Sequence, residues 1–344
     1  MTLPTKKRML MLTDGHCDNA SARIRAIQYI PYFEALGFQV THLPRVPQRS
    51  NHLIGKYLIS PILKRWFALK IGLAILFGRW DVLFIQRIFI GNFLLKRLTQ
   101  RSVSLIYDFD DAIYIHPRRP ENEEKTAMMV RAATHVIVST DYLQAFCRRW
   151  GKVAEVVPSP VEIDRIYPIE KTPGPMVTIG WMGSSTTSVH LALIERPLQR
   201  LASRCSFRFF AVGASSDCKI PGINFEAKPW IFEDENKDIG EMDIGVMPLL
   251  DTEYTRMKGG YKLLQYMSAG IPCVASPVGI NQSMIKTGEN GFLAATEDEW
   301  VAVLEALIND RELRIRLGVK GRKLAIELYS REVCFEKLKK ILFQ

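Results

Sequence analysis

Glycines and positive charges lie together in the second half of the chain, directly after a short apolar run. Lys258 precedes Gly259 and Gly260, and Lys262 follows at the start of an expected helix. Backbone amides, the helix dipole and ammonium groups at such a position all favour a bound anion, above all a phosphate. Arg256 adds a further cation. We predict a phosphate site here, with a solvated, basic helix start as the alternative.

Two polar features accompany this site. Gln265 lies one turn into the same expected helix, on the face shared by Lys258 and Lys262, where its amide is placed to hydrogen-bond a ribose. A second glycine turn, Gly183 followed by Ser184, comes directly after another apolar run. A glycine after a strand lets the backbone approach a diphosphate closely, and the alternative is an ordinary strand-to-helix turn.

The first half of the chain carries three acids at the end of an apolar run: Asp108, Asp110 and Asp111. Carboxylates so close repel one another, so we expect a function or a cationic partner. Asp110 and Asp111 are candidates for a general base, while the alternative for Asp111 is to cap the next helix. Asp108 and Asp110 share one face of a strand, and such a pair also suits Mg²⁺ or Mn²⁺.

Apolar runs of strand length alternate with helical patterns along the whole chain. Strands are predicted at 8–13, 38–43, 81–86, 103–109, 135–139 and 153–157, and again at 176–181, 207–212, 223–226, 243–247, 272–275 and 292–295. A helix is predicted over 22–36, ending at Gly37. The alternation indicates an α/β fold of doubly wound parallel sheets, in which ligands bind where the strands end.

The alternation is interrupted between residues 158 and 176, where five prolines stand. Neither helices nor sheets tolerate that density of proline. We therefore predict two domains, at 1–168 and 169–329, and a last helix at 330–344 that packs back toward the first domain.

Composition narrows the classes of partner. The 344 residues include 46 Lys and Arg against 36 Asp and Glu, a net charge of +10. This surplus suits nucleic acid, an anionic membrane surface or phosphorylated substrates. No helix-turn-helix, zinc or aromatic-basic signature is present, so we predict no nucleic-acid partner. Six cysteines without a CxxC pair indicate reduced thiols and a cytoplasmic protein.

No apolar run reaches the roughly 20 residues needed to span a bilayer. The stretch 52–80 nevertheless mixes lysines and arginines with apolar and aromatic residues, including Trp66 and Trp80. It suits peripheral attachment to an anionic membrane surface. The alternative is an amphipathic helix that covers the first sheet.

The segment 258–275, together with 276–281 and 289–292, resembles the retaining glycosyltransferases of family 4. The resemblance covers nearly the whole chain and is strongest over 176–330. It implies the GT-B fold, in which two Rossmann-like domains face each other across a cleft. Residues 169–329 would then bind the nucleotide-sugar donor, and residues 1–168 would form the acceptor side.

The resemblance also implies roles for the donor-side residues. Arg256, Lys258 and Lys262 would neutralise the diphosphate, because the Arg and Lys that relatives carry just after the turn at Gly183 and Ser184 are missing here. The family has two glutamates eight residues apart around this helix, the second binding the ribose. Met257 and Gln265 stand there instead, and Gln265 would hold the ribose through its amide.

In the first domain, relatives carry a flexible glycine loop that faces the donor and the acceptor across the cleft. Here that loop contains Gly15 and leads to Arg23, and the resemblance implies that both residues bind the donor. Asp110 and Asp111 fall where many relatives have a His-Asp pair that contacts the sugar or the acceptor. For Arg25, two residues beyond Arg23, we predict a solvated side chain.

The predicted function is therefore transfer of a sugar from a nucleotide-diphosphate sugar to a glycan or lipid-linked acceptor hydroxyl. The resemblance implies retention and a place in cell-surface polysaccharide or glycoconjugate synthesis, by a cytoplasmic enzyme peripheral at the inner membrane face. No cofactor or metal is expected to be required, Mg²⁺ or Mn²⁺ at Asp108 and Asp110 being the alternative. The rival functions are a nucleotide-sugar epimerase and a non-catalytic nucleotide-sugar-binding relative.

Overall fold

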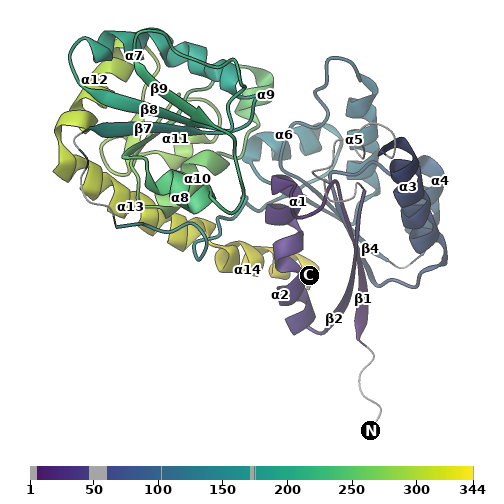
Figure 1. Cartoon of the computed structure of the whole chain (residues 1–344). Coiled ribbons are helices and arrows are strands. Elements are labelled where there is room, and N and C mark those ends of the chain that lie inside the picture. Colours follow the sequence, from purple (N-terminus) through teal and green to yellow (C-terminus); the bar gives the residue numbers. More distant parts are fainter. Residues whose placement is uncertain (1–5, 46–59, 102, 171–173, 175, 344) are drawn as a thin grey trace. The chain divides into compact units, whose positions relative to one another are not determined.

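The computed structural model describes residues 6–45, 60–101, 103–170, 174 and 176–343, and the side chains of these residues except 60–64. The chain divides into two compact units. Unit 1 comprises Met1–Ser159 and Phe335–Gln344, and unit 2 comprises Pro160–Cys334. Each unit is a parallel sheet with helices on both faces (Figure 1).

Unit 1 contains a six-stranded parallel sheet in the order β2-β1-β3-β4-β5-β6. Its strands are β1 (Lys7–Thr13), β2 (Phe38–Pro44), β3 (Val82–Gln86), β4 (Ser104–Phe109), β5 (His135–Val138) and β6 (Glu155–Val156). Every residue of β3 is buried, because helices cover both faces of the sheet. The six strands predicted in this half are confirmed.

The helices of unit 1 are α1 (Ala20–Arg25), α2 (Ile30–Ala35), α3 (Ser60–Phe77), α4 (Asn92–Thr99), α5 (Glu121–Ala132) and α6 (Asp141–Arg149). The single helix predicted over 22–36 is wrong, since α1 and α2 are separated by a 3₁₀ turn, Ile27–Tyr29. Pro31 in the first turn of α2 cannot donate a backbone hydrogen bond to a preceding turn. The predicted end at Gly37, where φ is +88°, is confirmed.

Unit 2 repeats the architecture with the order β12-β11-β10-β7-β8-β9, all parallel. Its strands are β7 (Val177–Met182), β8 (Phe207–Val212), β9 (Asn224–Lys228), β10 (Ile244–Met247), β11 (Cys273–Ala275) and β12 (Gly291–Leu293). All six were predicted from their apolar runs.

The helical segments of unit 2 form two layers, one on each side of the sheet (Figure 1). They are the 3₁₀ helix η3 (Ser188–Ile194) and the α-helices α7 (Glu195–Ala202), α8 (Glu235–Gly240), α9 (Glu253–Arg256), α10 (Tyr261–Ser268), α11 (Asn281–Met284), α12 (Glu297–Asn309) and α13 (Arg311–Tyr329). Two apolar cores result, because alternate residues of each strand face opposite layers. Trp181 packs with α7 and α12, whereas its neighbour Met182 packs with α8 and α10.

Helix α14 (Arg331–Leu342) begins in unit 2 and continues into unit 1. Phe335 packs within unit 1 against Tyr29, Tyr32 and Phe33, with ring centroids 5.4, 4.8 and 5.3 Å apart. Residues 160–168, which the proline pattern placed in the first domain, group with unit 2. No helix in the described part of the chain is long and apolar enough to cross a membrane.

Candidate functional site

Two lysines lie at the carboxyl edge of the second sheet. Lys258 follows α9, and its Nζ lies 4.7 Å from the ring centroid of Tyr254. Lys262, in the first turn of α10, places its Nζ 5.1 Å from the ring centroid of Trp181 and 3.5 Å from Oγ1 of Thr187. Within the described residues neither lysine makes an ion pair with a carboxylate. The two positive charges are therefore available to an anionic ligand.

The electrostatics of this edge reflect crowding of positive charge. Burial, and then the charge of Lys258, lower the pKa of Lys262 to about 7. His190 of η3 is buried, and its pKa is lowered by burial and by the same two lysines. Its Nδ1 accepts a hydrogen bond from the amide of Leu250, 3.4 Å away. A bound anion would relieve this repulsion and raise the pKa of Lys262 again.

Gly183 stands where the turn after β7 is most tightly packed. A Cβ on Gly183 would lie 2.4 Å from ring carbons of Trp181 and 2.9 Å from Cε of Lys262. Its amide donates to the carbonyl of Val212, so the turn is also fixed to β8. Ser184 is exposed, with Oγ 3.0 Å from Oγ1 of Thr186. The structure thus brings Gly183 and Lys262 together.

Arg256 differs from the two lysines. It ends the short helix α9, and its guanidinium forms two hydrogen bonds with Asp251, at 2.6 and 2.9 Å. Both side chains are about half exposed. Arg256 therefore already has a carboxylate partner, which a phosphate would have to replace or share.

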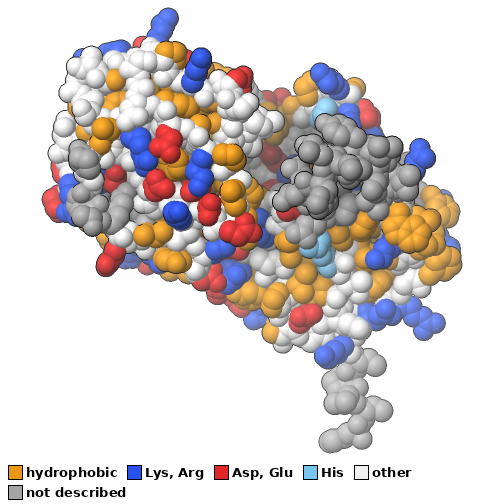
Figure 2. All heavy atoms as spheres, in the orientation of Figure 1, with side chains coloured by type: hydrophobic (Ala, Val, Ile, Leu, Met, Phe, Trp, Pro, Cys, Tyr) orange, Lys and Arg blue, Asp and Glu red, His pale blue; other side chains and the backbone are white. Residues whose placement is uncertain are grey.

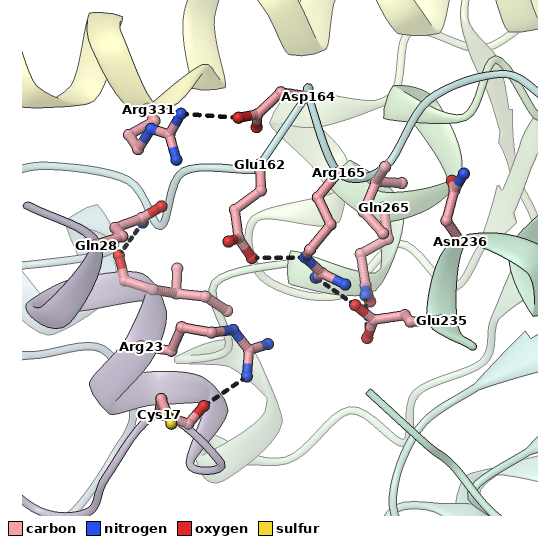
Figure 3. Close-up of polar contacts among 12 residues, drawn as sticks. Cys17, Arg23, Gln28, Glu162, Asp164, Arg165, Glu235, Asn236, Gln265 and Arg331 are labelled. Atoms are coloured by element: carbon pink, nitrogen blue, oxygen red, sulfur yellow. Dashed lines mark hydrogen bonds and ion pairs between the residues drawn. The ribbon is translucent and has the colours of Figure 1, made fainter. Parts of the chain in front are cut away.

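Gln265 is buried on α10 and faces polar side chains from α8 and from the segment that precedes β7 (Figure 3). Its Nε2 donates to Oε1 of Glu235 over 2.9 Å. The other carboxylate oxygen of Glu235 pairs with Arg165, which also contacts Glu162 at 3.1 Å. The predicted ribose residue is therefore held by a carboxylate from α8.

In unit 1, polar side chains meet at the ends of β1, β3 and β4. Ser21 of α1 donates to Oδ1 of Asp110 over 2.7 Å, and Gln86 donates to the hydroxyl of Ser21, also over 2.7 Å. Arg87, with a left-handed φ of +58°, approaches Asp110 at 3.5 Å. Non-glycine residues adopt this conformation only rarely, and Arg87 does so beside the network around Asp110.

The prediction of a solvated Arg25 was wrong. Arg25 is 3% exposed, and its guanidinium donates to both carboxylate oxygens of Asp108, at 2.5 and 3.2 Å. Its third hydrogen bond goes to the carbonyl of Val157, over 2.6 Å. Burial raises the pKa of Asp108 to about 6, although Arg25 opposes this shift. Helical exposure patterns alone could not foresee a partner 83 residues away.

This ion pair bears on the proposed metal site. Both carboxylate oxygens of Asp108 are occupied by Arg25, so Asp108 and Asp110 do not fit a pair of metal ligands. In the described part of the chain, no group of three His, Cys, Asp or Glu residues is arranged to hold a metal ion.

Asp111 does not cap the next helix, contrary to the alternative interpretation. Helix α5 begins only at Glu121, after Pro120, and the carboxylate of Asp111 accepts from the amide of Ala112 over 3.3 Å.

The remaining predicted residues lie in the loop after β1, which contains Gly15, and on α1, which contains Arg23. Asn19 caps α1, and a Cβ on Gly15 would lie 2.6 Å from the Cβ of Asn19, so glycine is needed for this close approach. Arg23 is buried and donates to the carbonyl of Cys17 over 3.0 Å (Figure 3). This hydrogen bond from the side chain of Arg23 to a main-chain carbonyl holds the loop close to α1.

The comparisons with known proteins agree with this geometry. Residues 176–310 match the family model described as glycosyl transferases group 1. The chain contains a glycosyl transferases group 1 domain. The matched range includes the donor-binding residues predicted in the second half of the chain, from Gly183 to Gln265. Comparison with curated protein sequences gave no match.

Several solved structures share the fold over nearly the whole length of the chain. A sucrose-phosphate synthase from Thermosynechococcus elongatus has 15% identity and a TM-score of 0.73 over 98% of this chain and 99% of that one. A glycosyltransferase from Rickettsia africae has 14% identity and a TM-score of 0.71 over 98% and 99%. Anabaena HepE, solved with UDP and glucose, has 13% identity and a TM-score of 0.68 over 98% of this chain and 99% of that one.

The chain thus has the α/β fold of GT-B glycosyltransferases, with two Rossmann-like units. The group 1 domain and the fold together support a glycosyltransferase enzyme. Sequence reasoning missed Glu235, Arg165 and His190, which the fold brings to the carboxyl edge of the second sheet. The acidic run around Glu235 was a signal for a charged partner, but it did not identify one.

Proposed function

We propose that this chain is a retaining glycosyltransferase of family 4, which transfers a sugar from a nucleotide-diphosphate sugar to a glycan or lipid-linked acceptor hydroxyl. The observation that carries the proposal is the pair of lysines, Lys258 and Lys262, beside the tight turn at Gly183, with no carboxylate partner among the described residues. Buried or half-buried cations of this kind suit a diphosphate. A uridine diphosphate sugar is the donor class to test first, because Anabaena HepE was solved with UDP and glucose.

In the donor half, Lys258 and Lys262 would stabilise the charge that develops on the leaving diphosphate, and Gly183 and Ser184 would let the backbone approach it. Arg256 would join them once a phosphate competes with Asp251. Gln265 would hold the ribose through its amide. None of these roles requires a metal, because the protein itself supplies the positive charge.

In the acceptor half, Asp110 and Asp111 would orient the sugar or take the proton of the acceptor hydroxyl. Gly15 and Arg23 would contact the donor from this half of the chain. A hydrogen bond from Ser21 and an ion pair with Arg87 keep Asp110 in a defined position, which is a requirement for either role. The pathway we propose is synthesis of a cell-surface polysaccharide or glycoconjugate.

The test is a thermal-shift panel of UDP, GDP, ADP, CMP and their sugars, with and without Mg²⁺ or Mn²⁺. We expect one nucleoside diphosphate to stabilise the protein without metal. Lys258→Ala should weaken binding of that diphosphate far more than binding of the nucleoside, whereas the exposed Lys320→Ala on α13 should change neither. Equal losses for the diphosphate and the nucleoside would refute the phosphate role of Lys258. Product analysis separates transfer from epimerisation of the donor.

We also propose that the enzyme attaches peripherally to an anionic membrane surface at the inner membrane face. The predicted stretch was 52–80, of which residues 52–59 lie outside the described part. Helix α3 carries an exposed apolar stripe whose members are spaced three or four residues apart: Trp66, Leu69, Leu73 and Phe77, exposed by 62, 54, 46 and 79%. They fall on one face of the helix, opposite the buried Ile71 and Ile75. Figure 2 shows hydrophobic side chains gathered over α3 and α4.

Positive charges lie next to one end of this stripe. A surface hollow of about 1020 Å³ is lined by Phe77, Trp80 and the cations Lys6, Lys7, Arg8, Arg79 and Arg101. Arg8 packs over the ring of Trp80, 4.8 Å from its centroid, so Trp80 is engaged within the unit while Trp66 is exposed. An apolar stripe beside a group of cations suits insertion among acyl chains with the cations at anionic headgroups.

Flotation with vesicles tests this attachment. The protein should float with phosphatidylglycerol vesicles at low salt, less at high salt, and not with phosphatidylcholine vesicles. The double variant Trp66→Ala/Phe77→Ala should bind about tenfold more weakly, while Val319→Ala, an equally exposed apolar residue on α13, should bind normally. Absence of flotation with phosphatidylglycerol at low salt would contradict the attachment.

A further inference from the structure

Glu235 is a buried carboxylate at the carboxyl edge of the second sheet, with 3% of its surface exposed. Three donors surround it. Trp230 and Gln265 both donate to Oε1 over 2.9 Å. The guanidinium of Arg165 pairs with Oε2 (Figure 3). Burial of a carboxylate is costly unless such donors satisfy it, so the site is a built arrangement of polar groups.

The carboxylate determines how the amide of Gln265 is oriented. An ionised carboxylate only accepts hydrogen bonds, so Gln265 must turn its Nε2 toward Glu235. Its Oε1 then faces away from Glu235 and accepts no hydrogen bond from the described residues. Gln265 therefore offers a fixed acceptor oxygen rather than an amide that can rotate.

The amide group of Gln265 follows the cationic site by one turn of α10. Lys262 is three residues earlier on α10, and Nε2 of Gln265 is 3.9 Å from the sulfur of Met182, the residue before Gly183. A ligand with its anionic groups at Lys262 and a hydroxyl donor one helical turn away would meet both groups. A nucleoside diphosphate has this form, since its ribose hydroxyls follow the phosphates.

We propose that Glu235 is a positioning residue, which fixes the amide of Gln265 so that its oxygen accepts a hydrogen bond from a ribose hydroxyl of the donor. The inference rests on the proposed function. According to this proposal, the negative charge beside the ribose is that of Glu235 on α8, and Gln265 itself carries none.

Arg165 stabilises the buried carboxylate of Glu235 and has a second carboxylate partner of its own. It pairs with Glu162 as well as Glu235, and it lies 4.5 Å from the ring centroid of Phe232. Burial lowers the pKa of Arg165, but Glu235 and Glu162 raise it more, so the guanidinium stays charged. Replacing Glu235 by glutamine still leaves Arg165 with Glu162, and we expect this variant to fold.

The test compares three probes on the full chain by calorimetry: UDP, its 2′,3′-dideoxy analogue, and inorganic pyrophosphate, with GDP and ADP in parallel. Glu235→Gln allows the amide of Gln265 to turn either way, because a glutamine both donates and accepts. We expect UDP to bind about tenfold more weakly, and the dideoxy analogue and pyrophosphate to change by less than about twofold. The exposed Glu233→Gln, two residues away, is the matched control.

An exchange variant provides the second test. Gln265→Glu alone places two carboxylates together and should weaken UDP binding, whereas Glu235→Gln/Gln265→Glu restores one carboxylate and one amide. The double variant should regain UDP affinity to within about threefold of the native protein. Additive losses, or a Glu235→Gln protein that binds UDP normally or loses pyrophosphate equally, would overturn the inference. A native protein that binds neither UDP, GDP nor ADP would instead overturn the proposed function.

Discussion

The guanidinium of Arg25 and the carboxylate of Asp108 form a two-armed ion pair that is buried on both sides, with side-chain exposures of 2 and 1%. The pair joins α1 to the end of β4, and the third hydrogen bond of Arg25 reaches Val157 beyond β6. The ion pair between Arg25 and Asp108 therefore fixes α1, which follows the loop after β1, to the end of β4, which precedes Asp110. We call this pair the buried anchor.

Loss of one partner of this anchor should be severe. Arg25→Met leaves Asp108 as an unpaired buried carboxylate, and we expect the free energy of unfolding to fall by about 3–5 kcal/mol. Arg25→Met/Asp108→Leu removes both charges and should recover much of that loss. Chemical denaturation measures both values. A double variant less stable than Arg25→Met would show that the ion pair is not what limits the single variant.

Nucleoside diphosphate binding should weaken as pH rises above about 7. The pKa of Lys262 is about 7 in the free protein, so Lys262 loses its charge above that pH, whereas a bound diphosphate raises the pKa and requires proton uptake. Affinity should fall by up to tenfold per pH unit between about 7.5 and 9, where the ligand, with a second pKa of about 6, is already ionised. His190, which faces the same lysines, is neutral in this range because its pKa is lowered.

Calorimetry in two buffers of different ionisation enthalpy measures this proton uptake directly. Lys262→Arg keeps its charge throughout the range and should abolish the pH dependence. Equal affinity of the native protein at pH 7.5 and pH 9 would contradict the assignment of Lys262 to the diphosphate.

Gly183 should not tolerate a side chain. Gly183→Ala puts a methyl group against the ring of Trp181 and the Cε of Lys262. We expect the free energy of unfolding to fall by about 1–3 kcal/mol and diphosphate binding to weaken. Gly72→Ala is the control, because its Cβ would meet nothing within 4 Å in the interior of α3. A normal melting temperature for Gly183→Ala would show that the turn can relax.

Asp110→Asn should separate catalysis from donor binding. Asparagine can still accept from Ser21, but it cannot take a proton or pair with Arg87, so turnover should fall by about a hundredfold or more. Binding of the nucleoside diphosphate should be unchanged. Release of nucleoside diphosphate in the presence of an acceptor fraction measures turnover. Asp111→Asn is the comparison, and equal turnover of Asp110→Asn and the native enzyme would remove Asp110 from the mechanism.

Most of the strands could be predicted from the sequence, because a strand that is buried on both faces appears as a continuous apolar run. All twelve predicted strands are present, and α10 begins at Tyr261 as expected. The helix over 22–36 could not be predicted correctly from periodicity, since Pro31 starts a new helix without disturbing the apolar spacing.

The polar partners were less predictable. Gln265 was expected to face the ligand together with Lys258 and Lys262, and no local pattern indicated that Glu235, 30 residues earlier, would hold its amide. The pairing of Arg256 with Asp251 could have been predicted from the sequence, because Arg256 follows Asp251 by only five positions. Long-range charge pairs depend on strand order, which the sequence does not state.

The path of the chain has a consequence for folding order. Unit 1 contains the first 159 residues but closes its aromatic cluster only with Phe335, which follows all of unit 2. During synthesis from the N-terminus, Phe33 and its neighbours must wait for a partner about 300 residues downstream, a loop whose closure is entropically costly and slow. Unit 2, apart from helix α14, can complete its cores first, so the earliest part of the chain to be made is among the last to reach its final packing.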